Sequence, residues 1–321
     1  MLSAQTIILI LVLLGASPGL FAQAYPAKPI RMIVGFAPGG GTDVTARAVV
    51  QELSEGLAQR VVIDNRPGAN GVVATEITAK APPDGYTILM VNLGHTVNPG
   101  LYPKLPYDTL KDFAPISLVA TLPNLLVIHP SLPVKTFPEF VRLARKQPGA
   151  IVYGSGGQGA SSHLSMELLQ KATNTKLLHV VYKSGGQSAI ALLAGEIMTS
   201  FNTIPSALPY VKAGRLRAIG VSSLQRSGSV PDVPTIAEMG YPGFSASGMS
   251  GLIAPVGTPT EAINRIHAEV VKLLKLPTVV QRFATLGLEP VGNTPAEFTQ
   301  YIRTDVDQWT KLTRELKLTL Q

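Results

Sequence analysis

The chain has 321 residues, of which 45% are apolar, 15% are charged and none is cysteine. This composition excludes an intrinsically disordered chain, which would be poor in apolar residues, and a scaffold held together by disulfides. Charged residues are scarce compared with the roughly 25% of an average soluble domain. The net charge of +7 is spread along the chain and favours anionic partners only weakly. We therefore expect a globular protein with no nucleic-acid partner.

The first 24 residues have the pattern of a secretory signal peptide. An apolar run, Ile7 to Leu14, is followed by Ala22-Gln23-Ala24, a small-x-small sequence typical of a cleavage site. The run is too short for a membrane anchor, which needs about 20 residues. The first charged residue is Lys28, so the positive region that usually precedes the apolar run is missing. We expect cleavage after Ala24 and a periplasmic mature chain, whose length favours two domains at roughly 150 residues each.

From Ile30 onward, short β-branched runs alternate with amphipathic segments, which is typical of an α/β fold with parallel strands. A helix is predicted over residues 42–59, because Ala46, Val49, Leu53 and Leu57 fall on one face. Strands are predicted at residues 30–34, 61–63, 87–91, 125–128, 151–153, 178–182, 197–201 and 216–221.

Three further helix starts carry the capping-box pattern, in which a Thr side chain and a Glu three residues later satisfy each other's backbone N–H groups. They are Thr136 with Glu139, Thr258 with Glu261, and Thr294 with Glu297. The final helix is predicted to run from Pro295 to near Leu318. The chain is expected to cross between domains near residues 120–124 and 245–251. Domain 1 would then comprise residues 25–122 plus 250–321, and domain 2 residues 123–249.

Two Gly-rich segments, Val34 to Asp43 and Tyr153 to His163, each lead from a predicted strand into a predicted helix. Glycines let backbone N–H groups approach a ligand, and the first turn of a helix carries partial positive charge. Ligands bind at the carboxyl ends of strands in open α/β sheets, so the two loops could face each other across a cleft between domains. Each loop could equally be an ordinary turn between strand and helix.

The motifs of several other functional classes are missing. Gly39-x-Gly41-x-x-Val44 lacks the third glycine of a dinucleotide-binding fingerprint, and no Walker loop is present. Ser155 does not stand in G-x-S-x-G, and the five histidines show no metal-binding pairing. We therefore expect no cofactor, no metal and no catalytic site.

A long series of motifs resembles the solute-binding receptors of tripartite tricarboxylate transporters, often called the Bug family. It includes Tyr25-Pro26-x-Lys28-Pro29-Ile30-Arg31, Gly39 to Asp43, Asn65 to Ala69, Pro82 to Thr87, Gly154-Ser155-x-Gly157-x-Gly159, Lys212-Ala213-Gly214, Pro231 to Thr235 and Ala254-Pro255-x-Gly257-Thr258-Pro259. The resemblance covers essentially the whole mature chain.

The resemblance implies a two-domain Venus-flytrap fold, similar to type II periplasmic binding proteins, with a hinge and a cleft between the domains. It also implies a monomeric receptor, not an enzyme, that captures a small mono-, di- or tricarboxylate and delivers it to a two-component membrane permease. An exported receptor for a sensor pathway, or an exported enzyme acting on carboxylates, would be the alternatives.

The resemblance further implies that a ligand carboxylate is held largely through backbone amides and ordered waters of two loops, which correspond here to Phe36 to Asp43 and Ser155 to His163. The candidate ligand-binding residues therefore come from these loops and from the ends of other predicted strands: Phe36, Pro38, Gly39, Gly40, Thr42, Asp43, Asn92, His95, Ser155, Gly156, Gln158, Gly159, Ser161, His163, Tyr182 and Asn202.

Asn202 departs from the family pattern, since many relatives have Phe-Asp where this chain has Phe201-Asn202. The change removes a carboxylate from the expected wall of the cleft. We hypothesise that the receptor suits a plain carboxylate better than an amino acid. Alternatively, Asn202 only caps a turn.

Overall fold

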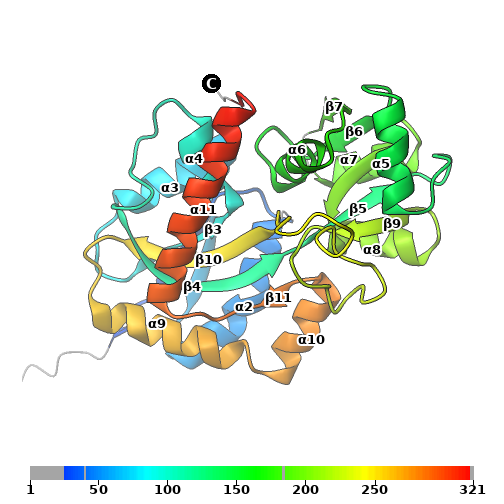
Figure 1. Cartoon of the computed structure of the whole chain (residues 1–321). Coiled ribbons are helices and arrows are strands. Elements are labelled where there is room, and N and C mark those ends of the chain that lie inside the picture. Colours follow the sequence, from blue (N-terminus) through cyan, green and yellow to red (C-terminus); the bar gives the residue numbers. More distant parts are fainter. Residues whose placement is uncertain (1–24, 40, 183–184, 319–321) are drawn as a thin grey trace, which may run out of the picture.

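The computed structural model describes residues 25–39, 41–182 and 185–318. The predicted signal peptide and the candidate residue Gly40 lie outside this described part. Two β-sheets with their helices form two lobes, which Figure 1 shows side by side. This arrangement confirms the predicted two-domain α/β fold. No helix in the described part of the chain combines the length and the apolar character needed to cross a bilayer.

The sheet of the first lobe has six strands in the order β11-β4-β10-β3-β1-β2. Strand β1 pairs in parallel with β2 and β3, whereas β10 pairs antiparallel with β3 and β4, and β4 antiparallel with β11. The strands are β1 (Ile30–Val34), β2 (Val61–Asn65), β3 (Thr87–Asn92), β4 (Phe113–Leu122), β10 (Gly248–Pro255) and β11 (Glu289–Pro290).

The sheet of the second lobe has five strands in the order β7-β6-β8-β5-β9. Strand β6 pairs in parallel with β7 and β8, and β5 pairs antiparallel with β8 and β9. The strands are β5 (Asn124–Ile128), β6 (Val152–Ser155), β7 (Leu178–Val181), β8 (Thr199–Thr203) and β9 (Arg217–Val221). Both sheets are therefore mixed, so the prediction of parallel pairing is right only in part.

The antiparallel strands β4 and β10 carry the chain out of the first lobe and back into it, and the sequence patterns predict neither of them. Pro115 interrupts the pattern of β4, and Gly248 and Gly251 weaken that of β10. Gly251 is needed in β10, because a Cβ there would come within 2.2 Å of the Phe298 ring.

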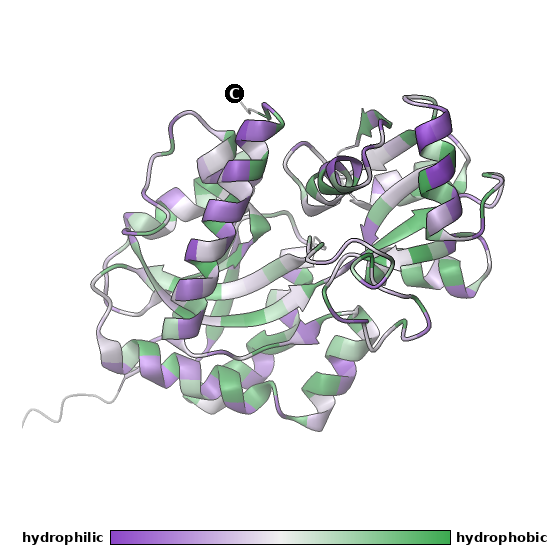
Figure 2. Ribbon diagram, viewed as in Figure 1, coloured by the Kyte–Doolittle hydropathy of each residue, from purple (hydrophilic) through white to green (hydrophobic). Residues whose placement is uncertain are grey.

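Helices cover both faces of the first sheet. The buried side chains of α2 (Gly41–Leu57), α9 (Thr260–Leu273) and α10 (Pro277–Leu286) pack in one core cluster with β1 and β3. Those of α3 (Val72–Ala79) and α11 (Pro295–Glu315) pack in another on the opposite face. Figure 2 shows the result, with apolar strands inside and polar residues on the outer turns of the helices.

The second lobe is built in the same way, with two clusters on the two faces of its sheet. The first contains residues of α5 (Phe137–Lys146) and α6 (Ser161–Thr173), and the second contains residues of α7 (Gly185–Leu193) and α8 (Ile204–Lys212). The cluster of α5 and α6 also takes in Trp309 of α11 and residues of α4 (Leu93–Leu101) from the first lobe. The apolar core is thus continuous between the lobes on this side.

Two of the three predicted capping boxes are confirmed. Thr136 with Glu139 caps α5, and Thr294 with Glu297 caps α11. The third is wrong, because the Thr258 hydroxyl donates to the carbonyl of Pro255 at 2.8 Å and α9 begins after Pro259 with no side-chain cap.

Candidate ligand-binding site

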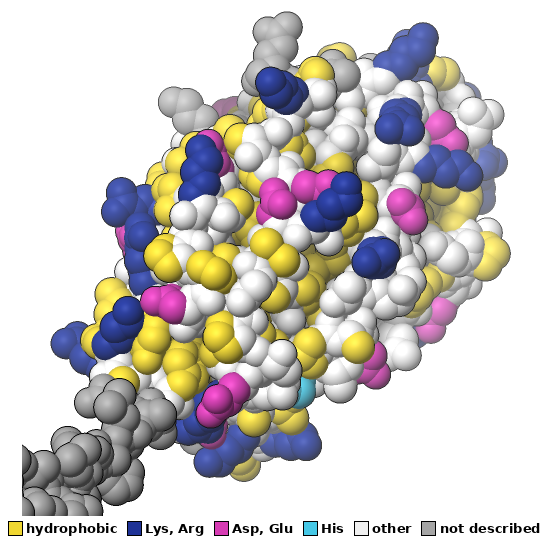
Figure 3. Space-filling view, turned by 90° about the vertical axis from the view of Figure 1, so that its left-hand side faces the viewer, with side chains coloured by type: hydrophobic (Ala, Val, Ile, Leu, Met, Phe, Trp, Pro, Cys, Tyr) yellow, Lys and Arg dark blue, Asp and Glu magenta, His cyan; other side chains and the backbone are white. Residues whose placement is uncertain are grey.

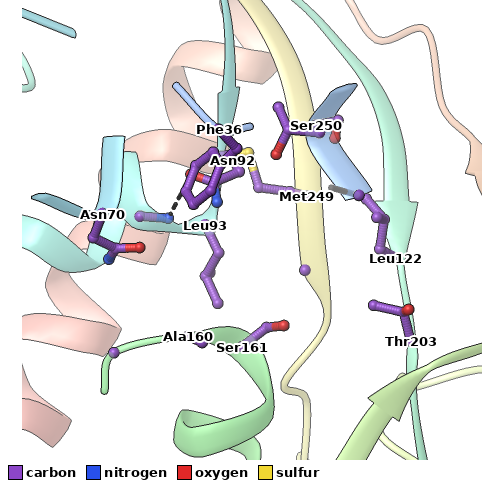
Figure 4. A pocket seen from close by; sticks show the side chains of 15 residues that line it. Phe36, Asn70, Asn92, Leu93, Leu122, Ala160, Ser161, Thr203, Met249 and Ser250 are labelled. Atoms are coloured by element: carbon purple, nitrogen blue, oxygen red, sulfur yellow. Dashed lines mark hydrogen bonds between the residues drawn. The ribbon is translucent and has the colours of Figure 1, made fainter. Parts of the chain in front are cut away.

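A cavity of about 160 Å³ lies where the two lobes meet. Figure 4 shows the residues of the first lobe on one side and those of the second lobe on the other. The first lobe contributes Phe36, Gly41, Thr42, Asn70, Asn92, Leu93, Gly94, Leu122, Gly248, Met249 and Ser250, and the second contributes Gly159, Ala160, Ser161 and Thr203. This is the cleft that the two-lobed fold predicts.

Four helices begin at this cavity. Gly41 starts α2, Leu93 starts α4, Ser161 starts α6, and Thr203 is the N-cap of α8. Each helix start presents N–H groups without intrahelical partners and the positive end of a helix dipole. Among the described residues that line the cavity, none is Asp, Glu, Lys, Arg or His. The cavity is therefore lined by positive potential of backbone origin and by small polar side chains, which suits an anion.

The net charge of the chain does not concentrate on the face shown in Figure 3, where Lys and Arg side chains lie scattered among acidic ones. Because the described cavity lining is itself uncharged, its positive potential comes from backbone groups and not from charged lining side chains. Among the described residues, no group of three His, Asp or Glu side chains is placed to hold a metal ion.

Asp43 fixes the first Gly-rich loop from behind the cavity. Its carboxylate is buried and accepts hydrogen bonds from the Gly39 amide at 2.9 Å, Arg47 Nε at 2.8 Å and Asn65 Nδ2 at 2.9 Å. Burial alone would raise the pKa of Asp43, but these three donors lower it below its ordinary value. Asp43 thus stays ionised and shapes the loop without lining the cavity.

The second Gly-rich loop uses most of its amides internally. The Gly156 amide donates to Ser162 Oγ, that of Gly157 to Ser155 Oγ, that of Gly159 to His163 Nδ1, and that of Ala160 to the carbonyl of Gly157. Helix α6 begins directly after this loop without a side-chain cap. Apart from the amide of the exposed residue Gln158, the amides that remain available to a ligand are therefore those of the first turn of α6, Ser161 to His163.

His95 is a buried residue of α4, the helix that begins at the main cavity. Both of its ring nitrogens lack a hydrogen-bond partner in the described part of the chain, and the ring packs edge-on against Phe113 at 5.2 Å between centroids. Burial lowers the pKa of His95 to about 3, so the ring is neutral. A second, very small cavity of about 10 Å³ is lined by Phe36, Asn92 and His95 among others.

The structure brings five predicted residues to the main cavity: Phe36, Thr42, Asn92, Gly159 and Ser161. Pro38, Gly39 and Gln158 are exposed. The remaining described candidates, which are Asp43, His95, Ser155, Gly156, His163, Tyr182 and Asn202, do not line it.

Asn70 is the most distinctive lining residue that the sequence patterns miss. Its Nδ2 donates to Asn98 Oδ1 at 2.9 Å, and Asn98 Nδ2 donates back to the Asn70 carbonyl at 3.2 Å. The backbone of Asn70 is left-handed, with φ 52°, a conformation that Asn adopts more easily than most residues. The dipeptide Asn70-Gly71, two residues after Gly68, is the local signal for such a turn. Leu122, Gly248, Met249 and Ser250 are missed because their strands are missed.

Known proteins resemble this chain over nearly its full length. The family model of the tripartite tricarboxylate transporter family receptor matches residues 45–318. A solved periplasmic transporter is 38% identical, with a TM-score of 0.83, and the match covers 93% of this chain and 100% of that one.

Two solved relatives from Rhodopseudomonas palustris contain ligands. One, solved with adipate, is 32% identical with a TM-score of 0.82 over 90% of this chain and 97% of its own. The other, MatC with bound malate, is 31% identical with a TM-score of 0.79 over 90% and 99%. The match to the family model extends over most of the chain, and the solved relatives share its two-lobed fold. The chain therefore belongs to the tripartite tricarboxylate transporter receptor family, whose members are solute-binding receptors without catalytic activity.

Proposed function

We propose that this receptor captures a small carboxylate without an ammonium group in the cavity between its lobes. The observation that carries the proposal is that four helices begin at a cavity whose described lining contains no charged side chain. Relatives were solved with adipate and with malate. These dicarboxylates define the ligand class that we assign to this chain.

The energetics favour recognition by several backbone groups together. One helix start contributes roughly 0.3–2 kcal/mol to holding an anion, whereas micromolar binding needs about 8 kcal/mol. Amide hydrogen bonds from Ser161 onward, hydroxyls of Thr42, Ser161 and Thr203, and exclusion of water supply the remainder. A cavity of roughly 150 Å³ holds a benzene-sized molecule, so the volume of about 160 Å³ favours short carboxylates.

An ammonium group would find no ionic partner among the described residues that line the cavity, because none of them is acidic. Burying a charged group without a partner is costly. The sequence also predicts a preference for plain carboxylates, on the basis of Asn202. The structure supports the same preference for a different reason, because Asn202 is not among the described lining residues and the preference rests on the residues that are.

We further propose export through cleavage after Ala24, function as a periplasmic monomer and delivery of the ligand to the two-component permease of the transporter. We also propose that domain 1 comprises residues 25–122 plus 250–321 and domain 2 residues 123–249, a division that the two separate sheets support. Strand β10 of the first sheet begins at Gly248, two residues before the proposed boundary.

Calorimetry on the mature chain tests the ligand class. Succinate and aspartate form a matched pair, because they differ only by the ammonium group. We expect malate, succinate or adipate to bind with a Kd in the micromolar range or tighter, and aspartate to bind at least about ten-fold more weakly than succinate. Ser161→Trp should fill the cavity and abolish binding, while Ser131→Trp, on an exposed loop of the same lobe, should not. Failure of every carboxylate to bind the wild type would refute the proposal.

A further inference from the structure

Three rings stack in the second lobe beside the Gly-rich loop. The His179 ring of β7 lies between Tyr153 of β6, at 4.5 Å between centroids, and His163 of α6, at 4.4 Å. The planes are nearly parallel, at 6° and 13°. Ser155 Oγ contacts His179 Nε2 at 2.7 Å, which joins the stack to the last residue of β6, within the second Gly-rich segment.

His163 holds the other end of this loop. Its Nδ1 accepts the amide hydrogen of Gly159 at 3.2 Å. Gly159 has a φ of +74°, which favours glycine, and it directly precedes Ala160 and Ser161 of the cavity lining. The contact between His163 and Gly159 therefore sets where α6 begins relative to the cavity.

The first lobe contains the same kind of hydrogen bond, from a loop glycine amide to a side chain in the first turn of the following helix, but with a different acceptor. There the amide of Gly39 is accepted by Asp43, four residues later, as Gly159 is by His163. Both acceptors are the third residue of their helix, α2 or α6. Asp43 places a negative charge at the start of α2, where it offsets the positive end of the helix dipole. A neutral His163 places none at the start of α6.

The titratable groups around His163 are His179, Tyr153 and Glu167. The Tyr153 hydroxyl donates to Glu167 Oε1 at 2.6 Å, and His163 Nε2 lies 3.9 Å from the same oxygen. Because Nδ1 accepts a hydrogen bond, the proton of neutral His163 resides on Nε2, on the side of Glu167. Burial lowers the pKa of His163 and of His179 to about 4, and His163 further disfavours charge on His179. Both rings are therefore neutral near pH 7.

We propose that His163 is a positioning residue, which fixes the second Gly-rich loop with a neutral acceptor and so leaves the start of α6 as the main anchor for a ligand carboxylate. This inference rests on the proposed function. It assigns unequal roles to the two loops, because the ionised acceptor Asp43 competes with an anion at α2 and the neutral acceptor His163 does not compete at α6.

The isosteric pair His163→Asn and His163→Asp tests the charge. Both side chains can accept the Gly159 amide, but only Asp adds a negative charge. With succinate as the probe at pH 7, we expect His163→Asn to retain affinity within about three-fold and His163→Asp to lose at least about ten-fold. Equal affinity of the two variants would overturn the inference. It would mean that residue 163 only has to accept the Gly159 amide and that its charge does not affect the ligand. Thermal melting of both variants verifies that they fold.

Hydrogen exchange of the Gly159 amide tests the positioning independently of any ligand. His163→Phe keeps a ring in the stack but has no acceptor. The Gly159 amide should be protected in the wild type and in His163→Asn, and should exchange at least about ten-fold faster in His163→Phe. Undiminished protection in His163→Phe would refute the positioning role even if carboxylates bind. Conversely, suppose that no carboxylate binds although the Gly159 amide exchanges faster only in His163→Phe. This result would refute the proposed function, but it would leave the role of His163 in holding the loop intact.

The pH profile adds a readout. Protonation of His163 at Nδ1 removes the acceptor and places a positive charge beside His179. The Gly159 amide should therefore exchange faster in the wild type than in His163→Asn as the pH is lowered from 7 towards 4, because Asn keeps a neutral acceptor. The pH dependence of amide exchange itself cancels in this ratio. A ratio independent of pH would contradict the inference.

Discussion

The Asp305 carboxylate on α11 accepts a hydrogen bond of 2.5 Å from the Thr96 hydroxyl on α4, which ties the last helix of the chain to a helix that begins at the cavity. Trp309 Nε1 donates to the other oxygen of the same carboxylate at 3.0 Å. Burial raises the pKa of Asp305 to about 6, although both donors act to lower it. The connection between α11 and α4 is therefore sensitive to pH.

We expect the stability of the wild type relative to Asp305→Asn to fall as the pH rises from 4 to 7. In the unfolded chain an Asp has a pKa of about 3.9, so the folded state binds this proton more tightly. The stability that Asp305 contributes is full below about pH 4 and is lost as the pH rises through about 6. The change relative to the variant should be about 2–3 kcal/mol.

Thermal melting at several pH values measures this difference. Asp307→Asn, on an exposed face of the same helix, controls for the loss of a negative charge from α11. A constant difference in Tm between wild type and Asp305→Asn from pH 4 to 7 would show that the buried carboxylate does not titrate as described.

The ion pair between Lys171 of α6 and Glu315 of α11 joins the two lobes at the surface. Both side chains are partly exposed, so the pair contributes about 0–1 kcal/mol. This arrangement of the lobes encloses the cavity. Lys171→Glu should therefore weaken succinate binding by about two- to five-fold through repulsion of Glu315, by shifting the population away from the arrangement that encloses the ligand.

Calorimetry at low and at high salt measures this effect, which salt should reduce because the charges are exposed. The double variant Lys171→Glu with Glu315→Lys restores attraction and should regain wild-type affinity. A double variant as weak as the single one would mean that Lys171 acts through something other than this pair.

Local patterns in the sequence predict most of the fold, because a β-branched run, a Gly-rich turn and an amphipathic segment are each encoded within a few residues. The strands β1 and β3 and the caps at Thr136 and Thr294 follow such patterns. The sequence predicts the site less well. It identifies both loops but not the direction in which each side chain points. Asp43 and His163 are therefore predicted as ligand contacts, whereas in the structure their side chains accept loop amides and do not line the cavity.

The remaining cavity walls depend on long-range pairing. Met249 and Ser250 reach the cavity because β10 pairs with β3 and β4, and Ser250 is opposite Asn92 in that register. No local pattern encodes a pairing between residues more than 150 positions apart, and the glycines of β10 hide the strand itself.

Asn202 provides a direct test of whether the cavity lining or the strand end selects the ligand. Its side chain is buried, its Nδ2 bonds to Ser200 Oγ, and its Oδ1 lies 4.0 Å from the position that a Cβ on Gly185 of α7 would occupy. Asn202 thus lies beneath the start of α7 and is not among the residues that line the cavity.

We expect Asn202→Asp to leave the ratio of aspartate to succinate affinity unchanged within about three-fold. Calorimetry with both ligands measures this ratio, and Asn202→Ser, which removes the amide without adding charge, is the control. A marked gain in aspartate affinity confined to Asn202→Asp would instead establish that the side chain at position 202 decides whether an ammonium group is bound. That outcome would agree with the hypothesis drawn from the Phe-Asp pattern of many relatives.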